Sequence, residues 1–157
     1  MMKRSFLTLF VLLLLSAVMT GCGERQPDQI DLQTFFEETC EKYDLAGMAE
    51  LEGEMLDVFY PGLSELDTVQ RVAYSPMISS SVSEYVFLQC ADRETAQKAG
   101  EILQQRIESQ ANGGAWYPES MEAWGRAKIV TKDNYLLMIA SDAYTDRIAS
   151  DFEALWE

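Results

Sequence analysis

The chain has no histidine and is poor in positive charge, with 12 lysines and arginines against 26 aspartates and glutamates in 157 residues. Without histidine there is no serine–histidine or cysteine–histidine nucleophile, no imidazole metal ligand and no histidine pH switch. The formal net charge of −14 argues against a nucleic-acid partner, because neutralising phosphates requires clusters of Lys and Arg. No glycine-rich phosphate loop, C-x-x-C pair, G-x-S-x-G or S-x-x-K string occurs either. We therefore expect no catalytic constellation of a familiar type.

What the chain does contain is enough apolar sequence for one folded domain. Apolar residues make up 48% of the composition, which is ordinary for a globular protein and unlike a disordered one. A length of 157 residues fits a single domain.

The first 21 residues have the layout of a secretory signal peptide. Lys3 and Arg4 supply a basic start, and the uncharged run over 6–18 follows. A helix that spans a bilayer needs about 20 apolar residues, so this run is short for a permanent anchor. We expect residues 1–21 to be removed on export.

Met19-Thr20-Gly21-Cys22 resembles the lipobox of bacterial lipoproteins. The resemblance implies cleavage before Cys22 and a diacylglyceryl thioether on its sulfur. Two acyl chains suit stable anchoring, because one chain binds a membrane only marginally. Residues 22–30 then form the lipidated cysteine and a polar tether with a reach of about 15 Å. The membrane partner is thus expected through Cys22, on the extracytoplasmic face of the cell membrane; an unmodified cysteine in a secreted protein is the alternative.

Removing 21 of the 157 residues leaves 136, and losing Lys3 and Arg4 leaves 10 positive against 26 negative charges, a net charge of −16. Such a domain is not attracted to an anionic lipid surface by its own charge. The lipid would have to do the anchoring.

Residues 31–157 are predicted to form one α+β domain. Asp31 and Asp92 are N-cap candidates for helices beginning at Leu32 and Arg93, and Asp142 for the last helix. Asn134 can take positive φ in a hairpin turn. The expected elements are helices over 32–43, 46–60, 93–110, 118–125 and after 142, and strands over 68–75, 84–91, 128–131 and 135–141.

An offset of 50 residues superposes one part of this domain on another without a gap. Tyr85 falls on Tyr135 and Asp92 falls on Asp142, so a strand, an aspartate cap and an amphipathic helix occur twice. We expect two β-β-α units to pair into a four-stranded antiparallel sheet with helices packed on one face, preceded by N-terminal helices. The pattern does not determine the strand order.

The strings YSPMISSSVSEYVFLQCAD and KIVTKDNYLLMIAS, the second preceded by Pro118, resemble lipoproteins grouped as domain of unknown function 4358. The resemblance covers roughly Leu56 to the C-terminus and implies an exported lipoprotein of Gram-positive bacteria. It carries no catalytic residues to transfer. This chain differs from the family pattern in its longer Gly113-Gly114-Ala115 loop and in the aromatic segment around Trp116.

Cys40 and Cys90 are the thiols left once Cys22 is lipidated. Outside the cytoplasm they could form a disulfide. Both lie in apolar stretches, where buried free cysteines are common, so free thiols are favoured.

Acidic residues and serines offer weaker candidates for chemistry. Acidic faces such as Glu37, Glu41 and Asp44 could bind a cation, but no calcium-loop string occurs and solvated helix faces explain them. Two carboxylates could act as glycosidase acid and base if the fold placed them across a cleft. Ser79, Ser80, Ser81 and Ser83 are explained as loop residues. No metal site, cofactor or catalytic residue is predicted.

The segment GGAWYPESMEAWG carries Trp116, Tyr117 and Trp124. Aromatic rings on loops form sugar platforms or protein-contact anchors, because they bury area at low entropy cost. The alternative is that they cover an open end of the core.

These observations predict a membrane-anchored extracytoplasmic lipoprotein that acts as a non-catalytic binding or interaction module of the cell envelope, with an envelope protein as a possible partner. The alternative is a carboxylate-dependent hydrolase acting on cell-wall glycans. Fold class alone does not decide between them.

Overall fold

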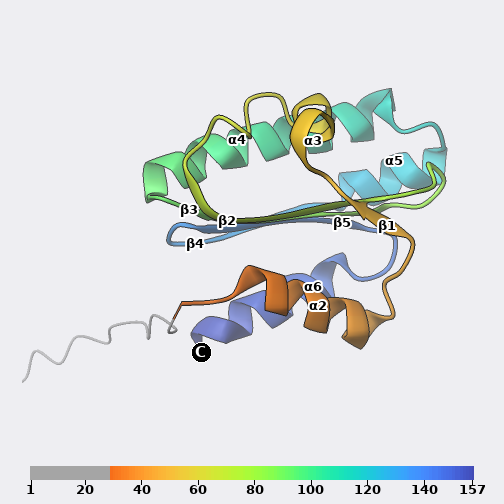
Figure 1. The fold of residues 1–157 in the computed structure, drawn as a ribbon. Helices are drawn as coiled ribbons and strands as arrows, with labels where there is room; N and C mark the ends of the chain where they lie inside the picture. The colour runs from red at the N-terminus through yellow and green to blue at the C-terminus, as the bar shows by residue number, and fades with distance from the viewer. Residues whose placement is uncertain (1–28) are drawn as a thin grey trace, which may run out of the picture.

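The computed structural model describes residues 29–157, so the predicted signal peptide, Cys22 and all but the end of the predicted tether lie outside the described residues. The described chain is an α+β fold with one antiparallel sheet of five strands in the order β1-β2-β3-β5-β4 (Figure 1). The strands are β1 (Met48–Glu50), β2 (Thr68–Pro76), β3 (Ser83–Cys90), β4 (Lys128–Lys132) and β5 (Tyr135–Ser141). The helices are α2 (Leu32–Tyr43), α3 (Gly53–Phe59), α4 (Arg93–Ser109), α5 (Pro118–Gly125) and α6 (Thr145–Glu153).

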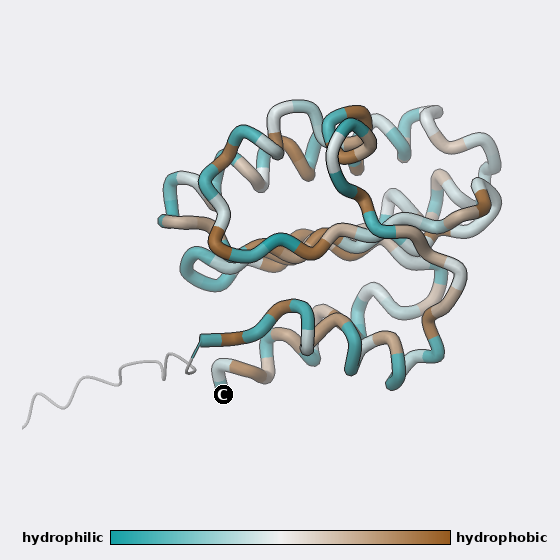
Figure 2. Tube along the Cα trace, in the orientation of Figure 1, coloured by the Kyte–Doolittle hydropathy of each residue, from teal (hydrophilic) through white to brown (hydrophobic). Residues whose placement is uncertain are grey.

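Helices cover both faces of the sheet, and each face has its own core (Figure 1). Val86 and Met138 point to the face of α3, α4 and α5, whereas Phe87 and Leu137 point to the face of α2 and α6. Successive strand residues point to opposite faces, so a strand buried on both sides is apolar throughout. Figure 2 accordingly shows hydrophobic stretches running along the sheet between the two helical layers.

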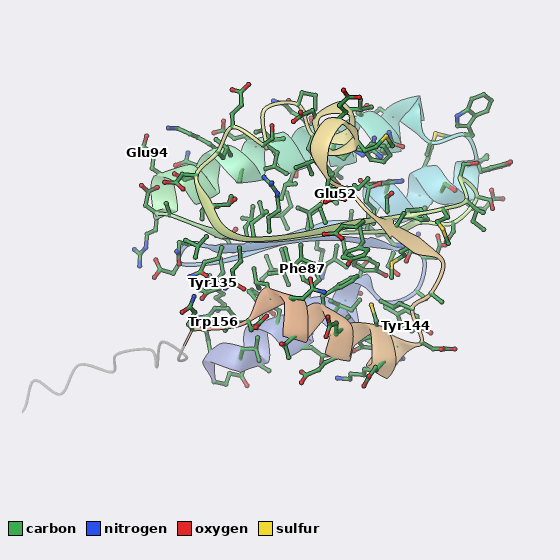
Figure 3. All side chains as sticks on the ribbon, in the orientation of Figure 1. Glu52, Phe87, Glu94, Tyr135, Tyr144 and Trp156 are labelled. Atoms are coloured by element: carbon green, nitrogen blue, oxygen red, sulfur yellow. The ribbon has the colours of Figure 1, made fainter. Side chains whose placement is uncertain are left out.

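The layer under α2 and α6 is largely aromatic. Phe87 points from β3 into this layer (Figure 3), where its ring lies 5.7 Å from Phe35 and 5.8 Å from Phe36. Phe152 of α6 meets Phe35 edge-on at 5.7 Å. Tilted rings at these distances favour one packing arrangement over others.

The predicted helix over 32–43 and every predicted element after residue 60 are present, with bounds that differ by a few residues at most, and two predicted caps are confirmed. The backbone N–H of Thr34 donates to Asp31 Oδ1 at 3.0 Å, and that of Thr95 donates to Asp92 Oδ1 at 2.7 Å. Each bond satisfies a donor that the first helical turn leaves without a backbone partner.

The prediction of a continuous helix over 46–60, and hence of only four strands, is wrong. Gly47 and Gly53 take φ of +70° and +53°, which end helical geometry on either side of Met48–Glu50. The three residues between them form β1 and pair with Tyr74–Pro76 of β2. The sheet therefore gains a fifth, short edge strand.

The prediction of helices on one face is also wrong, because α6 lies on the face opposite α4. An offset of 50 would start α6 at residue 143, but it begins at Thr145, two residues later. Asp142 is not its cap: this carboxylate accepts the backbone N–H of Val82 at 3.1 Å. The longer connection after β5 allows the chain to reach the other face.

In the two-residue turn between β4 and β5, Asp133 has positive φ (56°), and Asn134, predicted for that role, instead donates its amide to the Cys90 carbonyl at 2.5 Å.

Cys40 and Cys90 are both free. They belong to the cores on opposite faces of the sheet.

Candidate functional site

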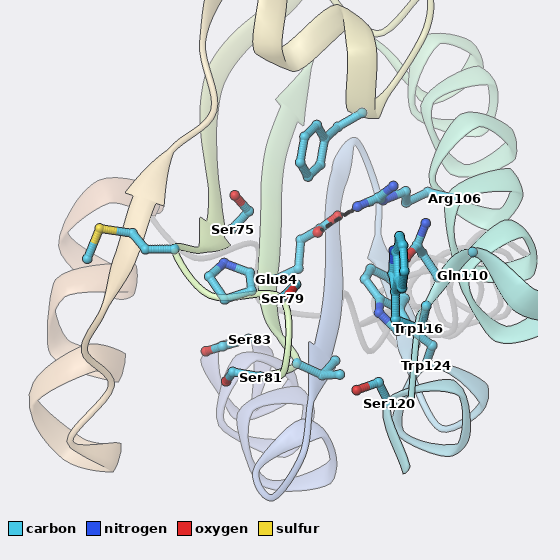
Figure 4. Close-up of a pocket in the computed structure, with 16 residues that line it drawn as sticks. Ser75, Ser79, Ser81, Ser83, Glu84, Arg106, Gln110, Trp116, Ser120 and Trp124 are labelled. Atoms are coloured by element: carbon cyan, nitrogen blue, oxygen red, sulfur yellow. Dashed lines mark hydrogen bonds and ion pairs between the residues drawn. The ribbon is translucent and has the colours of Figure 1, made fainter. Parts of the chain in front are cut away.

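A pocket of about 400 Å³ opens at the end of the sheet where β2 ends and β3 begins (Figure 4). One wall is formed by the end of β2, the loop that follows it and the start of β3. The other wall comes from the C-terminal part of α4, the 114–116 connection and α5, and Phe59 of α3 closes the inner end. Three separate parts of the chain thus meet around one space.

The inner end of the pocket holds a buried ion pair, Glu84 with Arg106 (Figure 4). Glu84 is only 2% exposed. Arg106 donates from Nε to Oε1 and from Nη2 to Oε2, each at 3.0 Å, and the Tyr60 hydroxyl also donates to Oε1. The carboxylate is therefore held in a bidentate pair with a third donor, which fixes its position.

Aromatic rings hold the other partner. The guanidinium carbon of Arg106 lies 4.4 Å from the centre of the Phe59 ring and 5.4 Å from that of Trp124. Burial disfavours the charge on Arg106, but its hydrogen bonds to Glu84 and the negative charge of Glu84 outweigh this and raise its pKa. Burial, and then the charge of Glu84, raise the pKa of Tyr60 well above its usual value. Arg106 therefore stays charged, and Tyr60 stays a hydrogen-bond donor to Glu84.

Three polar groups face the pocket without a protein partner. In the described part of the chain, no deeply buried side-chain nitrogen or oxygen lacks a hydrogen-bond partner. Arg106 Nη1 and the hydroxyls of Ser75 and Ser120 have no acceptor or donor among the described residues, so they must be solvent-accessible. All three residues line the pocket, although Ser75 and Ser120 are only 6% and 4% exposed. Their open hydrogen-bonding groups are thus available to a ligand.

The aromatic residues predicted to bind a partner do not form one exposed patch. Trp116 stands at the rim with 87% of its surface exposed, and Tyr117 next to it is 49% exposed. Trp124 is 5% exposed and belongs to the core above the sheet, although part of its ring lines the pocket. Trp124 thus covers the core, as the alternative interpretation expected, whereas the binding role of the exposed Trp116 and Tyr117 stays a prediction.

The loop after β2, whose Met77 lines the facing wall of the pocket, also exposes apolar side chains. Met77 and Ile78, in the loop after β2, are 68% and 63% exposed. Large apolar side chains on both sides of a pocket are typical of a surface that is covered when a ligand or partner binds.

The other candidates give no reactive site among residues 29–157. No three His, Cys, Asp or Glu side chains in this range gather as metal ligands would. Burial raises the pKa of the Cys40 and Cys90 thiols, which makes them poor nucleophiles. Ser79 and Ser81 line the pocket, but the one carboxylate among the lining residues is Glu84, already bonded to Arg106.

Sequence reasoning missed Tyr60, Glu84 and Arg106. Arg106 lies beside the apolar stripe of α4, three residues after Leu103 and directly before Ile107. Glu84 is the second residue of β3, and the next four residues of this strand are buried. In each case the available signal was a charged residue at the edge of an apolar pattern. Only the fold shows that Glu84 and Arg106 pair with each other.

One sequence-family model, described as "Domain of unknown function (DUF4358)", matches residues 41–141. The matched segment includes the whole pocket and ends before α6. No curated protein and no solved structure matches the chain. Within the described range, no helix has the length and apolar character needed to cross a membrane.

Proposed function

The chain belongs to the family described as domain of unknown function DUF4358, and from its pocket we propose that it is a membrane-anchored extracytoplasmic lipoprotein whose domain acts as a non-catalytic binding module of the cell envelope. The anchor is the lipid predicted on Cys22. The binding site is the pocket between the start of β3 and the α4–α5 connection.

The observation that carries this proposal is the contrast between the fixed inner end of the pocket and its apolar rim. Glu84 and Arg106 satisfy each other inside, so the walls are positioned before any ligand arrives. Met77 and Trp116, which line the pocket, expose large apolar surfaces at the rim. A preorganised pocket surrounded by apolar contacts favours binding, because little ordering cost remains to be met.

The direction in which the pocket faces also supports a role in the envelope. The Gln70 side-chain amide donates to the Ile30 carbonyl at 2.8 Å, so the described chain starts beside the beginning of β2. The pocket lies at the opposite end of the sheet, where β2 ends and β3 begins. With a short tether from Cys22, the domain would present the pocket away from the membrane.

The hydrolase alternative has less support. Glycosidases use two carboxyl groups about 5–9.5 Å apart on either side of the scissile bond. Glu84 is the one carboxylate among the residues that line this pocket, and both of its oxygens accept hydrogen bonds from Arg106. If the protein cleaved cell-wall glycans and Glu84→Gln abolished this cleavage, the hydrolase would be favoured over the binding module.

Site-specific photo-cross-linking in living cells tests the binding role. A photoreactive residue replaces Trp116 at the rim, and a matched variant carries it at Val69, which is 57% exposed and lies outside the pocket. We expect a discrete cross-linked species at position 116 and none at position 69. Equal cross-linking at both positions, or none at either, would contradict the proposal.

Fatty-acid labelling tests the anchor separately. We expect the wild-type chain to incorporate a labelled fatty acid and Cys22→Ala to lose the label and leave the membrane fraction. Cys90→Ala is the matched control, since Cys90 is buried in the core. Labelling that persists in Cys22→Ala would refute lipidation at this residue.

A further inference from the structure

The polar groups that the pocket leaves open are of a particular kind. Ser75 comes from β2, Arg106 from α4 and Ser120 from α5. The two serine hydroxyls and Arg106 Nη1 form no hydrogen bond with another described residue. Ser79 and Ser81 add hydroxyls from the loop at the rim (Figure 4). A hydroxyl both donates and accepts, whereas a guanidinium only donates. The best complement is a ligand rich in oxygen whose groups can also play both roles.

The charges in the pocket favour a neutral ligand. Glu84 and Arg106 are the charged residues that line it, and they neutralise each other at 3.0 Å. An ionic ligand would find no unpaired opposite charge there. Anions are further disfavoured by the formal net charge of −14 on the chain.

The environment of β2 argues against an extended peptide. Peptides that bind a sheet usually add a strand to a free edge and pair through their backbone. Beside the pocket, Tyr74 already pairs with Glu50 of β1 on one side and with Tyr85 of β3 on the other. The β2–β3 pairing ends at Tyr74 and Tyr85, and the pocket-lining ends of the two strands each keep one neighbour, β1 for β2 and β5 for β3. Only two residues of each strand are left unpaired there, which is too short a length for an added strand.

The rim supplies an aromatic face. The electron-rich face of an indole attracts weakly positive C–H groups, and the axial C–H groups of a pyranose ring make the faces of the sugar apolar. Trp116, at 87% exposure, is available for this contact at the mouth of a pocket lined with hydroxyls.

Together these observations lead us to infer that the pocket binds a neutral oligosaccharide of hexose or N-acetylhexosamine units, with one ring against Trp116 and hydroxyl or carbonyl oxygens on Arg106 Nη1, Ser75 and Ser120. This inference rests on the proposed binding function and specifies its ligand. No bond is made or broken.

The test is a titration of the purified full chain in detergent with chitotetraose, maltotetraose and tetragalacturonate, followed by calorimetry. We expect saturable binding of at least one of the two neutral tetrasaccharides, and weaker binding of the anionic one. Trp116→Ala should weaken that binding about tenfold, the effect of one lost aromatic contact with its buried area. Val69→Ala, also an exposed apolar residue outside the pocket, should leave it unchanged.

A second variant tests the polar contacts without disturbing the fold. Ser120→Ala removes a hydroxyl with no protein partner, so its melting temperature should match that of the wild type while saccharide affinity falls about threefold to tenfold. Ser150→Ala, on the exposed side of α6, is the control and should change neither.

The outcomes separate this inference from the proposed function. If neither neutral tetrasaccharide binds but cross-linking at position 116 captures a protein, the saccharide inference is overturned and the binding role stands. If neither experiment finds a ligand, both are overturned. Tighter binding of tetragalacturonate, or equal losses in Trp116→Ala and Val69→Ala, would also overturn the saccharide inference.

Discussion

At the scale of single residues, the pair of Glu84 and Arg106 is the most consequential feature of the molecule. Arg106 retains 17% of its side-chain surface, and Glu84 retains 3%. A buried charge that loses its partner keeps the full cost of its desolvation, whereas a pair replaced together by apolar groups need not destabilise the protein. The main effect of the pair is therefore to fix the inner wall of the pocket, and its net contribution to the free energy of unfolding is small.

Arg106→Met should accordingly lower the free energy of unfolding by about 3–5 kcal/mol, because it leaves Glu84 buried without its partner. The triple variant Tyr60→Phe, Glu84→Leu, Arg106→Met removes every member of the cluster and should recover most of that loss. Urea denaturation followed by circular dichroism measures both. A single variant as stable as the wild type would mean that Glu84 finds another partner or water.

Asp92 gives a pH-dependent prediction. Hydrogen bonds from the backbone and side chain of Thr95 lower the pKa of this carboxyl group in the folded state. Its contribution is therefore complete above the unfolded-state pKa and is lost as the pH falls through the lower folded-state pKa. Asp92→Asn keeps an acceptor oxygen but does not titrate, so its melting temperature should fall less between pH 7 and about pH 2 than that of the wild type. Glu101→Gln on the same helix is the control and should follow the wild type.

These residues also show where sequence reasoning stops. Asp92 could be identified because an N-cap depends on neighbours within three residues. Glu84 and Arg106 are 22 positions apart, and nothing local indicates that the end of α4 passes over the start of β3. A polar residue beside an apolar stripe is common, and only the packing distinguishes a paired one from an exposed one.

At the scale of elements, the connection between α4 and α5 determines where Trp116 stands. A Cβ atom added at Gly114 would lie 2.7 Å from the Ser109 carbonyl oxygen, which is backbone and cannot turn aside. Gly125, at the end of α5, has nothing within 4 Å of such an atom. The two glycines thus allow a comparison, since Gly114 precedes α5 and has no room for a Cβ atom, whereas Gly125 ends α5 and has room.

Gly114→Ala should lower the free energy of unfolding by about 1–3 kcal/mol, the usual cost of an added group in a space without room. Gly125→Ala should be neutral or stabilise by up to about 1 kcal/mol, because alanine restricts the unfolded chain more than glycine does. Thermal melts of the two variants provide the comparison. Equal effects would show that the connection can shift to accept a side chain.

The elements also show why the internal repeat predicted the strands better than the helices. Val86 and Leu136 occupy equivalent places in the repeat and point to the same face, as their shared position in two apolar strands requires. The helices after these strands diverge because Asp142 bonds to Val82 instead of capping α6. The connection after β5 (142–144) is one residue longer than the connection after β3 (91–92), and a pattern of apolar positions does not reveal this difference. The two helices nevertheless lie on opposite faces of the sheet.

At the scale of the whole molecule, the position of the chain start relative to the pocket gives the proposed anchor a geometric consequence. Trp156 lies with its ring 5.7 Å from that of Tyr135, at the end of the sheet beside which the described chain begins (Figure 3). Trp116 lines the pocket at the other end of the sheet, where Ser83 of β3 pairs with Ser141 of β5. Strand β5 alone separates these ends by about 20 Å, at roughly 3.3 Å per residue.

A lipid-anchored chain in vesicles that contain brominated lipids should therefore show stronger fluorescence quenching at Trp156 than at Trp116. Single-tryptophan variants, with the other two tryptophans changed to Phe, report each position separately, and Cys22→Ala supplies the unanchored control, for which both signals should be unquenched. In the opposite orientation the pocket rim would face the membrane. Met77, Ile78 and Trp116 expose apolar surface that a membrane interface could accept. Stronger quenching at Trp116 would mean that the pocket rim lies in the membrane surface. The domain would then bind lipid, and the proposal that it presents its pocket to the envelope would be wrong.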